Sequence, residues 1–271
     1  MKLTVLQSVY KKDNAQYLHE CFESLAKQSL PADKIVLVKD GTLTQELEDI
    51  IHQWQDKLPL QVVGYEENKG LAYALNYGLQ FVDTELVARM DSDDICYPDR
   101  FEKQVAFMER YHEISVSSGH VEEFVKEPDK VIAIKKVPIG KGKIEKYLRS
   151  RNAMNHMAVI FRKSAVESVG GYEQVPYFED YDLWVRMVQA GYKLENEDTV
   201  LVKARIGNDM IGRRHGIQYC RHEIYFLRKM YRMGFIHCLQ LYRLFLLRIP
   251  VRLFPKRILS FIYTHFLRGH K

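Results

Sequence analysis

Three aspartates, Asp91, Asp93 and Asp94, lie within four residues directly after the apolar run Leu86–Met90. Carboxylates so close together at the end of a buried strand repel one another and lose hydration, unless a cation or several hydrogen-bond donors compensate their charge. Alternate side chains of an extended segment lie on one side, so an Asp-x-Asp pattern can hold a hard divalent ion that also takes phosphate oxygens as ligands. For this three-residue pattern alone, a solvated acidic turn is the commoner explanation, because short patterns arise often by chance.

A second acidic group, Glu179, Asp180 and Asp182, opens a segment with helical periodicity. Helix N-termini favour acids through the helix dipole, which is a purely structural explanation of this group. Residues two apart on a helix point in nearly opposite directions, so one of Asp180 and Asp182 can face a cleft as a general base. Arg186 follows Asp182 by four residues, which predicts an ion pair on the helix surface worth about 0.3–0.5 kcal/mol if exposed.

The elements that must position these acids begin with four predicted strands, at Leu3–Val9, Ile35–Val38, Leu60–Val63 and Leu86–Met90. Helices are predicted between them, after Asn14, from Thr44 to about Lys57 and over Leu71–Leu79. Alternation of strand and helix implies right-handed crossovers and parallel neighbouring strands. The carboxyl ends of such strands meet at one edge of the sheet, which is where open α/β sheets bind ligands.

Polar clusters follow each of these strands, although loops are polar in any protein and some clustering is expected. The clusters are Ser8 to Tyr10, Asp40 to Thr42, Asn68 to Gly70 and Asp91 to Asp94. Neither the Gly-x-Gly-x-x-Gly fingerprint nor the Gly-x-x-x-x-Gly-Lys-Ser/Thr phosphate loop is present in the sequence, which excludes the two commonest nucleotide-binding motifs. The sequence therefore predicts an α/β fold, a doubly wound and mostly parallel sheet flanked by helices, whose nucleotide-binding half spans about residues 1–98.

Residues 99–216, about as long, are predicted to be a second half of mixed helices and strands. Helices are expected from Arg100 to about Tyr111, over Lys141–Arg151 and ending at Val169, with strands at Ile114–Ser118, Val121–Val125, Val131–Ile134 and Met157–Phe161. The pair Gly170 and Gly171 follows the last of these helices. Paired glycines permit positive φ and close backbone approach, or form the C-cap of a helix.

The remaining segment, residues 217–271, is predicted to be a helical, basic tail. The 271-residue chain has a net charge of +5, whereas residues 224–271 hold ten Lys or Arg and no acid, so residues 1–223 carry −5. Large aliphatic side chains interleave with the basic ones, and no uncharged apolar run reaches the roughly 18 residues of a membrane span. A segment lying in the interface of an anionic membrane fits this pattern best. Packing on the body or on a second subunit is the alternative, and a nucleic-acid partner is disfavoured.

The compartment is predicted from the cysteines and the first residues. Cys21, Cys96, Cys220 and Cys238 are widely spaced, without a Cys-x-x-Cys pair. This pattern is typical of reduced thiols in a cytoplasmic protein. The apolar start is interrupted by Gln7 and Ser8, without a small-residue cleavage site after it. It is therefore interpreted as a strand and not as a signal peptide.

Taken together, several of these motifs resemble the family 2 glycosyltransferases. They are Asp40–Thr42, Asn68–Gly70, Ala88–Asp94, Asn155–His156, Gly170–Tyr172, Glu179–Arg186 and the loop Asn208–Gly216. The resemblance covers about residues 3–216 and is greatest to bacterial enzymes of amylovoran, O-antigen, capsule and exopolysaccharide assembly. It implies the GT-A fold for residues 1–216, with an acceptor half over about 99–216, and inverting transfer of a sugar.

The resemblance also implies a role for each matching residue. Asp40 would recognise the nucleotide base beside Ser8 and Tyr10, and Asn68, Gly70 and Asp91 would complete the nucleotide-sugar site, Asp91 on the ribose side. Asp93 would bind Mg²⁺ or Mn²⁺ on the diphosphate, and Asp180 would be the catalytic base. Arg213, with Arg214, would hold the diphosphate, although surface solvation is the commoner fate of paired arginines. Glu179, Asp94 and His156 are candidates for acceptor contact; for His156 a hydrogen bond at the edge of the core is an equal alternative to acceptor or metal contact.

Two departures from the family pattern qualify these roles. Lys39 stands where many members have a first aspartate, which leaves base recognition less well defined. The Gln-x-x-Arg-Trp motif of processive synthases is absent after Asp180, which favours addition of a single sugar.

The resulting hypothesis is an enzyme that moves one hexose from a nucleoside diphosphate sugar, by resemblance UDP-galactose or UDP-glucose, to a lipid-linked saccharide acceptor. The acceptor would be linked through polyprenyl diphosphate, at the inner face of the cytoplasmic membrane. Two other classes stay open. A sugar-1-phosphate nucleotidyltransferase would need a Gly-rich loop with Arg and Lys after the first strand, which is not seen. A non-catalytic nucleotide-sugar binding protein at the membrane would not need Asp180.

Overall fold

The computed structural model describes residues 1–140, 142–207 and 215–253. The first half contains β1 (Leu3–Val9), α1 (Ala15–Ala26), β2 (Lys34–Asp40), α2 (Gln45–Gln55), β3 (Leu60–Tyr65), α3 (Leu71–Leu79) and β4 (Leu86–Met90). The second half contains β5 (Ile95–Cys96), α4 (Arg100–Arg110), β6 (Ile114–Phe124), β7 (Ala133–Lys135), α5 (Lys143–Leu148), the 3-10 turn η1 (His156–Ala158), β8 (Ile160–Arg162), α6 (Lys163–Ser168), α7 (Glu179–Gln189) and β9 (Lys193–Arg205). Two helices, α9 (Ile217–Arg232) and α10 (Cys238–Leu253), follow.

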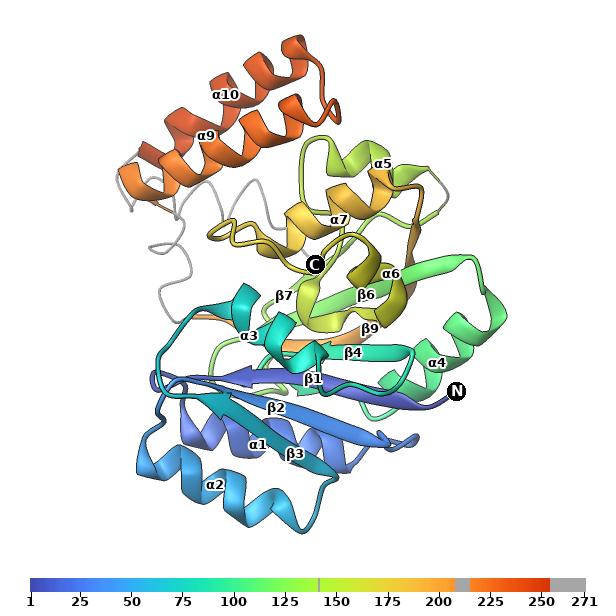
Figure 1. Cartoon of the computed structure of the whole chain (residues 1–271), viewed down its shortest axis with the longest axis vertical. Helices are drawn as coiled ribbons and strands as arrows, with labels where there is room; N and C mark the ends of the chain where they lie inside the picture. The colour runs from blue at the N-terminus through green and yellow to red at the C-terminus, as the bar shows by residue number, and fades with distance from the viewer. Residues whose placement is uncertain (141, 208–214, 254–271) are drawn as a thin grey trace.

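Among the described residues, one sheet runs through both halves in the order β3-β2-β1-β4-β8-β6-β9-β5, with β7 beside β6. The strands β1 to β4 are parallel, as the alternation of strands and helices predicts. Their register brings Ser8 opposite Val38 and Gln7 opposite Met90. The segments that follow β1, β2 and β4 therefore begin at the same edge of the sheet (Figure 1).

Each face of the sheet has its own hydrophobic core. On one face, α1, α2 and α4 pack through side chains such as Phe22, Trp54 and Phe101. On the other face, α3, α5, α6, α7 and α9 share a larger core with the opposite sides of β1, β2 and β4. In Figure 1 the hairpin of α9 and α10 lies beyond α7, at the end of the molecule farthest from α1 and α2.

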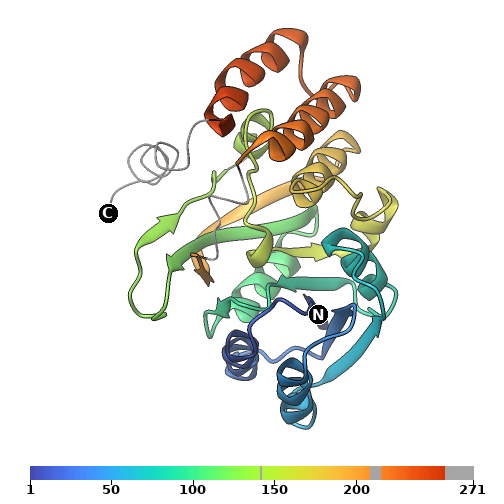
Figure 2. The same ribbon diagram turned by 90° about the vertical axis from the view of Figure 1, so that its left-hand side faces the viewer.

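The second half differs from its sequence-based prediction in three places. The two strands expected at Ile114–Ser118 and Val121–Val125 form the single strand β6, which is irregular around Gly119 and His120 and is joined to β7 by a turn that projects from the body (Figure 2). A Cβ at Gly119 would lie 2.7 Å from Leu201 Cδ1, so this glycine allows close packing of β9. The strand expected from Met157 begins only at Ile160, after η1. The 13-residue strand β9 was not predicted, because its first half is mostly polar.

The predicted helical tail is helical over α9 and α10, as far as it is described. The side chains of Phe226, Leu227 and Met230 are fully buried in the core that α7 also enters. Within the described ranges, no helix combines the length and the hydropathy that a membrane span requires.

Candidate active site

Two predicted site residues, Ser8 and Asp40, share one face of the sheet with Arg89, which was not predicted as a site residue. Ser8, Asp40 and Arg89 each stand two residues after a β1, β2 or β4 side chain that lies in the α3 and α7 core. Because side chains alternate along a strand, all three point to this face. Tyr10 lies at the rim of the same edge with 36% of its surface exposed, whereas Asp40 is 6% exposed.

Asp40 anchors the loop between β3 and α3. One carboxylate oxygen accepts hydrogen bonds from the Tyr65 hydroxyl at 2.9 Å and the Lys69 amide at 2.7 Å. The other accepts from Asn68 Nδ2 at 2.9 Å and the Gly70 amide at 3.1 Å. These four donors match the four lone-pair directions of a carboxylate. The structure thus brings Asp40, Asn68 and Gly70 together, as a network in which Asp40 holds the loop.

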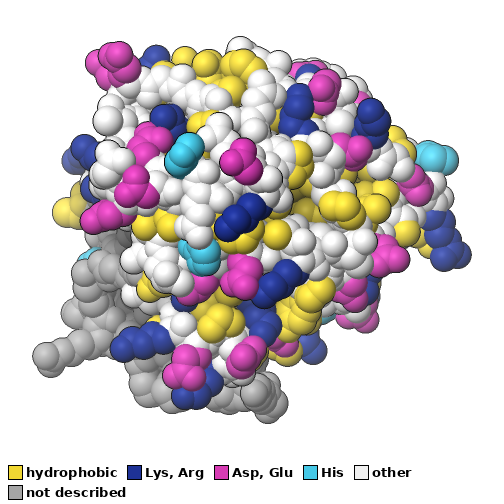
Figure 3. Space-filling model, turned by 90° about the horizontal axis from the view of Figure 1, so that it is seen from below, with side chains coloured by type: hydrophobic (Ala, Val, Ile, Leu, Met, Phe, Trp, Pro, Cys, Tyr) yellow, Lys and Arg dark blue, Asp and Glu magenta, His cyan; other side chains and the backbone are white. Residues whose placement is uncertain are grey.

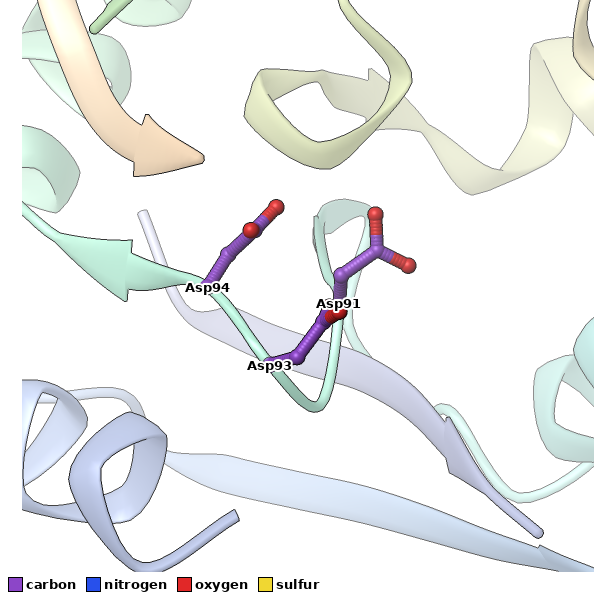
Figure 4. Close-up of side chains that lie close together, drawn as sticks. All are labelled: Asp91, Asp93 and Asp94. Atoms are coloured by element: carbon purple, nitrogen blue, oxygen red, sulfur yellow. The ribbon is translucent and has the colours of Figure 1, made fainter. Parts of the chain in front are cut away.

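The three aspartates after β4 form a group whose nearest carboxylate oxygens all lie within 4.8 Å of one another. Figure 4 shows Asp91 and Asp94 extending to the same side of their loop. Burial, together with repulsion from Asp91, raises the pKa of Asp93 to about 6 and the pKa of Asp94 well above its usual range. The negative charge of this loop is therefore only partly compensated by the protein.

A fourth acid, Asp13, lies beside this loop and was not predicted as a site residue. It accepts hydrogen bonds from Ser92 Oγ at 2.8 Å and from the Tyr10 amide at 3.2 Å. Burial raises its pKa to about 6, and the charge on Asp91 adds to the effect. The sequence signal was its position just after β1, at the edge where the other polar clusters gather.

Two arginines hold the acidic loop. Arg89, 2% exposed, forms an ion pair with Asp91. Arg205, at the end of β9, donates its amide to Asp94 Oδ1 at 2.7 Å and its Nε to the Asp93 carbonyl at 3.1 Å. Because Asp93 and Asp94 keep raised pKa values beside these cations, the oxygen-rich group fits a hard divalent ion such as Mg²⁺ or Mn²⁺.

The predicted base, Asp180, lies in the first turn of α7. Its Oδ2 accepts a hydrogen bond from Asn152 Nδ2 at 2.6 Å, and its Oδ1 accepts one from the Tyr181 amide at 2.7 Å. Burial raises its pKa, which Lys135 and Arg89 partly counteract. Arg89, whose ion pair is with Asp91, has the same lowering effect on the pKa of Asp94. Burial raises the pKa of the neighbouring Glu179 to about 7. The position of Asn152 gave no recognisable signal in the sequence.

Asp182 forms the predicted pair with Arg186, at 2.7 Å from Nε, but the prediction that this pair lies on the helix surface was wrong. Asp182 is 0% exposed, and Lys229 of α9 approaches its other oxygen to 2.6 Å. The pair is buried because α9 covers this side of α7. Two cations therefore compensate Asp182, and of the two acids Asp180 is the one whose contacts are neutral hydrogen bonds.

His156 contacts Tyr172, the residue that follows the glycine pair. His156 Nε2 is 3.0 Å from the Tyr172 hydroxyl, and burial lowers the pKa of the imidazole well below its usual range, so the ring is neutral at pH 7. This is the predicted hydrogen bond at the edge of the core. Asn76 of α3 brackets the Tyr172 backbone, accepting its amide at 2.8 Å and donating to its carbonyl at 2.7 Å. At Gly171, where φ is +68°, a Cβ would lie 2.4 Å from Asn76 Oδ1, which requires glycine.

The glycine pair also forms the helix C-cap that was the alternative interpretation of its sequence. The amides of Gly170 and Gly171 bond to the Glu167 and Val166 carbonyls at the end of α6. The pair is therefore a helix C-cap and a close contact at once. Arg213 and Arg214, the predicted diphosphate ligands, lie outside the described residues.

A mostly parallel sheet whose carboxyl edge carries an acidic loop, with a half-buried carboxylate at the start of a nearby helix, is the arrangement expected of a GT-A glycosyltransferase. The chain belongs to glycosyl transferase family 2, whose model matches residues 4–168. It is 40% identical to the amylovoran biosynthesis glycosyltransferase AmsE of Erwinia amylovora, over 98% of this chain and 99% of that one. It is 36% identical to the UDP-Gal:alpha-D-GlcNAc-diphosphoundecaprenol beta-1,3-galactosyltransferase of Escherichia coli, over 98% and 97%.

A solved structure has the same fold. The mannosyltransferase PcManGT from Pyrobaculum calidifontis, in complex with GDP-Man and Mn²⁺, superposes with a TM-score of 0.67 at 18% identity, over 100% of this chain and 76% of that one. The family and the GT-A fold predicted from the sequence are thereby confirmed.

Proposed function

We propose that this glycosyltransferase moves a single hexose from a UDP-sugar, UDP-galactose or UDP-glucose, to a lipid-linked saccharide in the biosynthesis of a cell-surface polysaccharide. The names of the two relatives support the pathway, and the Escherichia coli enzyme's name supports a UDP-linked donor and a diphosphate-lipid acceptor. The observation that carries the proposal is that the acidic loop at the carboxyl edge of the sheet is accompanied by a separate carboxylate, Asp180, which neutral hydrogen bonds hold at the start of α7. A nucleotidyltransferase or a binding protein would not need the second carboxylate.

The donor lies along the carboxyl edge of the sheet in this proposal. Ser8 and Tyr10 form the wall beside the base, and Asp91 faces the ribose. Asp40 would contact the base only by exchanging one of its four hydrogen bonds, so its first contribution is to hold Asn68 and Gly70 in place. Asp93 would hold a divalent ion, which when bound would supply Lewis-acid stabilisation of the leaving diphosphate.

Asp180 takes the proton from the acceptor hydroxyl as that oxygen forms its bond to the anomeric carbon. The bond from this carbon to the diphosphate oxygen breaks on the opposite face, and the electron pair leaves with the diphosphate. A single displacement inverts the configuration, so an α-linked donor gives a β-linked product. The raised pKa of Asp180 supports the role of base, because a carboxylate in a poorly solvated site binds a proton more strongly.

The proposal is tested by measuring the release of nucleoside diphosphate from UDP-, GDP- and dTDP-sugars with lipid-linked acceptors, with Mn²⁺ and with chelator. Asp180→Asn should lower turnover by about 10²–10⁴-fold while donor binding is kept. Asp129→Asn, at a side chain that is 97% exposed, is the matched control. Unchanged turnover of Asp180→Asn would contradict the assignment of the base. Silence with every donor, with metal-dependent UDP binding intact, would favour the binding-protein alternative.

A further inference from the structure

One side of the hairpin formed by α9 and α10 packs against α7, the helix that carries Asp180. Phe226 stacks on Phe178, with ring centroids 4.9 Å apart and planes 11° apart, and it also contacts Tyr181 at 4.8 Å. Lys229 pairs with Asp182 at 2.6 Å. These contacts flank the turn that carries Asp180, so the hairpin and the base are held in a fixed relation.

A buried acid joins the two helices of the hairpin. Glu223 is 0% exposed and forms ion pairs with Arg248 and, at 3.1 Å, with Arg252 of α10. It is also the last acidic residue of the sequence. The charge of Glu223 is therefore neutralised within the hairpin. Every charged side chain after it in the sequence is basic.

The outer side of the hairpin combines exposed apolar and basic side chains. A groove of about 310 Å³ runs between the helices, lined by Ile224, Arg228, Phe245, Leu246, Ile249 and Pro250. The exposed apolar side chains include Leu239 (79%), Tyr242 (62%), Leu246 (58%) and Leu247 (59%). The exposed arginines are Arg221, Arg228, Arg232 and Arg243.

We propose that this outer face docks on the surface of an anionic lipid bilayer. The inference rests on the proposed function, since a lipid-linked acceptor would be presented at such a surface. Leucine and tyrosine side chains enter the boundary between headgroups and acyl chains, and the arginines meet lipid phosphates. The helices lie in the interface, which agrees with the absence of a spanning helix among the described residues.

The positive charge of this face favours an anionic bilayer over a second copy of the chain as its partner. A second copy docking face to face would oppose arginines to arginines, and no acid follows Glu223 to compensate them. The opposite end of the molecule, seen in Figure 3, intersperses acidic and basic side chains and has no such bias.

Docking through this face would set the height of Asp180 above the bilayer, because α9 holds α7 through Phe226 and Lys229. The hairpin is then a rigid spacer between the membrane and the base. Loss of docking should impair transfer to a lipid-linked acceptor, and leave transfer to a short water-soluble acceptor unaffected.

The test uses the full chain and sedimentation with vesicles of phosphatidylcholine alone or mixed with phosphatidylglycerol. Wild-type protein should bind the anionic vesicles, less at high salt, and leave the neutral ones. The triple variant Arg228→Glu, Arg243→Glu and Leu246→Glu should bind at least about thirtyfold more weakly. The matched control is Lys57→Glu, Arg110→Glu and Ile132→Glu, at exposed positions outside the hairpin.

Equal binding by the triple variant and the wild type would overturn the proposal. So would a wild-type dimer, detected by equilibrium sedimentation, that the triple variant disperses, since a second copy would then cover the face. Circular dichroism checks that the variant is folded. If the vesicles are bound but no donor is turned over, the proposed function fails while the docking face stands; turnover without anionic binding gives the reverse result.

Discussion

The acidic loop after β4 and the acidic start of α7 use the same residue type, yet their charges are compensated differently. In the loop, Asp93 and Asp94 keep raised pKa values although Arg89 and Arg205 lie beside them. On α7, Asp182 is enclosed by Arg186 and Lys229. An acid that the protein leaves partly uncompensated can bind an external cation, whereas an acid that it fully pairs serves the fold. Residue type alone does not distinguish the two roles.

Among the tests of this comparison, replacing Asp93 by Asn gives the largest expected effect. Turnover with Mn²⁺ should fall by about a thousandfold, since Lewis-acid stabilisation is worth several kcal/mol and each 1.36 kcal/mol is about tenfold in rate. The thermal midpoint without metal should stay the same or rise, because a repelling, poorly solvated charge is removed. Initial rates and calorimetry measure the two effects. A clearly lower midpoint would mean that Asp93 is structural, and the contrast with Asp182 would fail.

Replacing Asp182 by Asn should give the opposite result. The free energy of unfolding should fall by about 3 kcal/mol, because Arg186 and Lys229 lose their buried partner and keep only the half-exposed Glu173. Denaturant titration measures this loss. Glu145→Gln is a matched control, because Glu145 also pairs with an arginine four residues on, Arg149, at 2.8 Å but at the surface. Its loss should be only about 0.3–0.5 kcal/mol. Equal losses of unfolding free energy would show that burial does not make the ion pair of Asp182 more stabilising than the exposed pair of Glu145.

The sequence predicted best what is local. The strands Leu3–Val9 and Leu86–Met90 have the predicted bounds, and the acidic loop follows the second of them. Periodicity and turn chemistry within one segment suffice for such elements. The structure likewise places Asp180 at the start of the predicted helix α7.

What the sequence did not reveal depends on distant partners. Arg205 lies more than a hundred residues after Asp94, at the end of β9. This strand was not predicted, because its first half is mostly polar. Lys229 and Asp182 meet only because α9 returns to cover α7, and this contact turned the expected surface pair of Asp182 and Arg186 into a buried one. Asn152 reaches Asp180 from a segment without a motif. Such pairings are set by the packing of whole elements, which no spacing rule within one segment encodes.

Glu179 offers the smallest effect and the finest test of compensation, because it lies directly beside Asp180 in the first turn of α7. Burial raises its pKa from 4.5 to about 7, with a further contribution from the charge of Asp180. The folded protein therefore holds the Glu179 proton more tightly than the unfolded chain does. The contribution of Glu179 to the free energy of unfolding of the wild type is fully present below about pH 4.5. It is lost as the pH rises through 7.

Glu179→Gln should consequently match the wild type in unfolding free energy at pH 4.5 and exceed it at pH 8, because glutamine does not ionise. Denaturant midpoints across this range measure the difference, with Glu145→Gln as the solvent-exposed control. A constant difference across the range would mean that Glu179 is solvated and that the start of α7 leaves only Asp180 poorly compensated. A difference that grows with pH would place Glu179 with Asp93, among the acids whose charge the fold leaves open to a ligand.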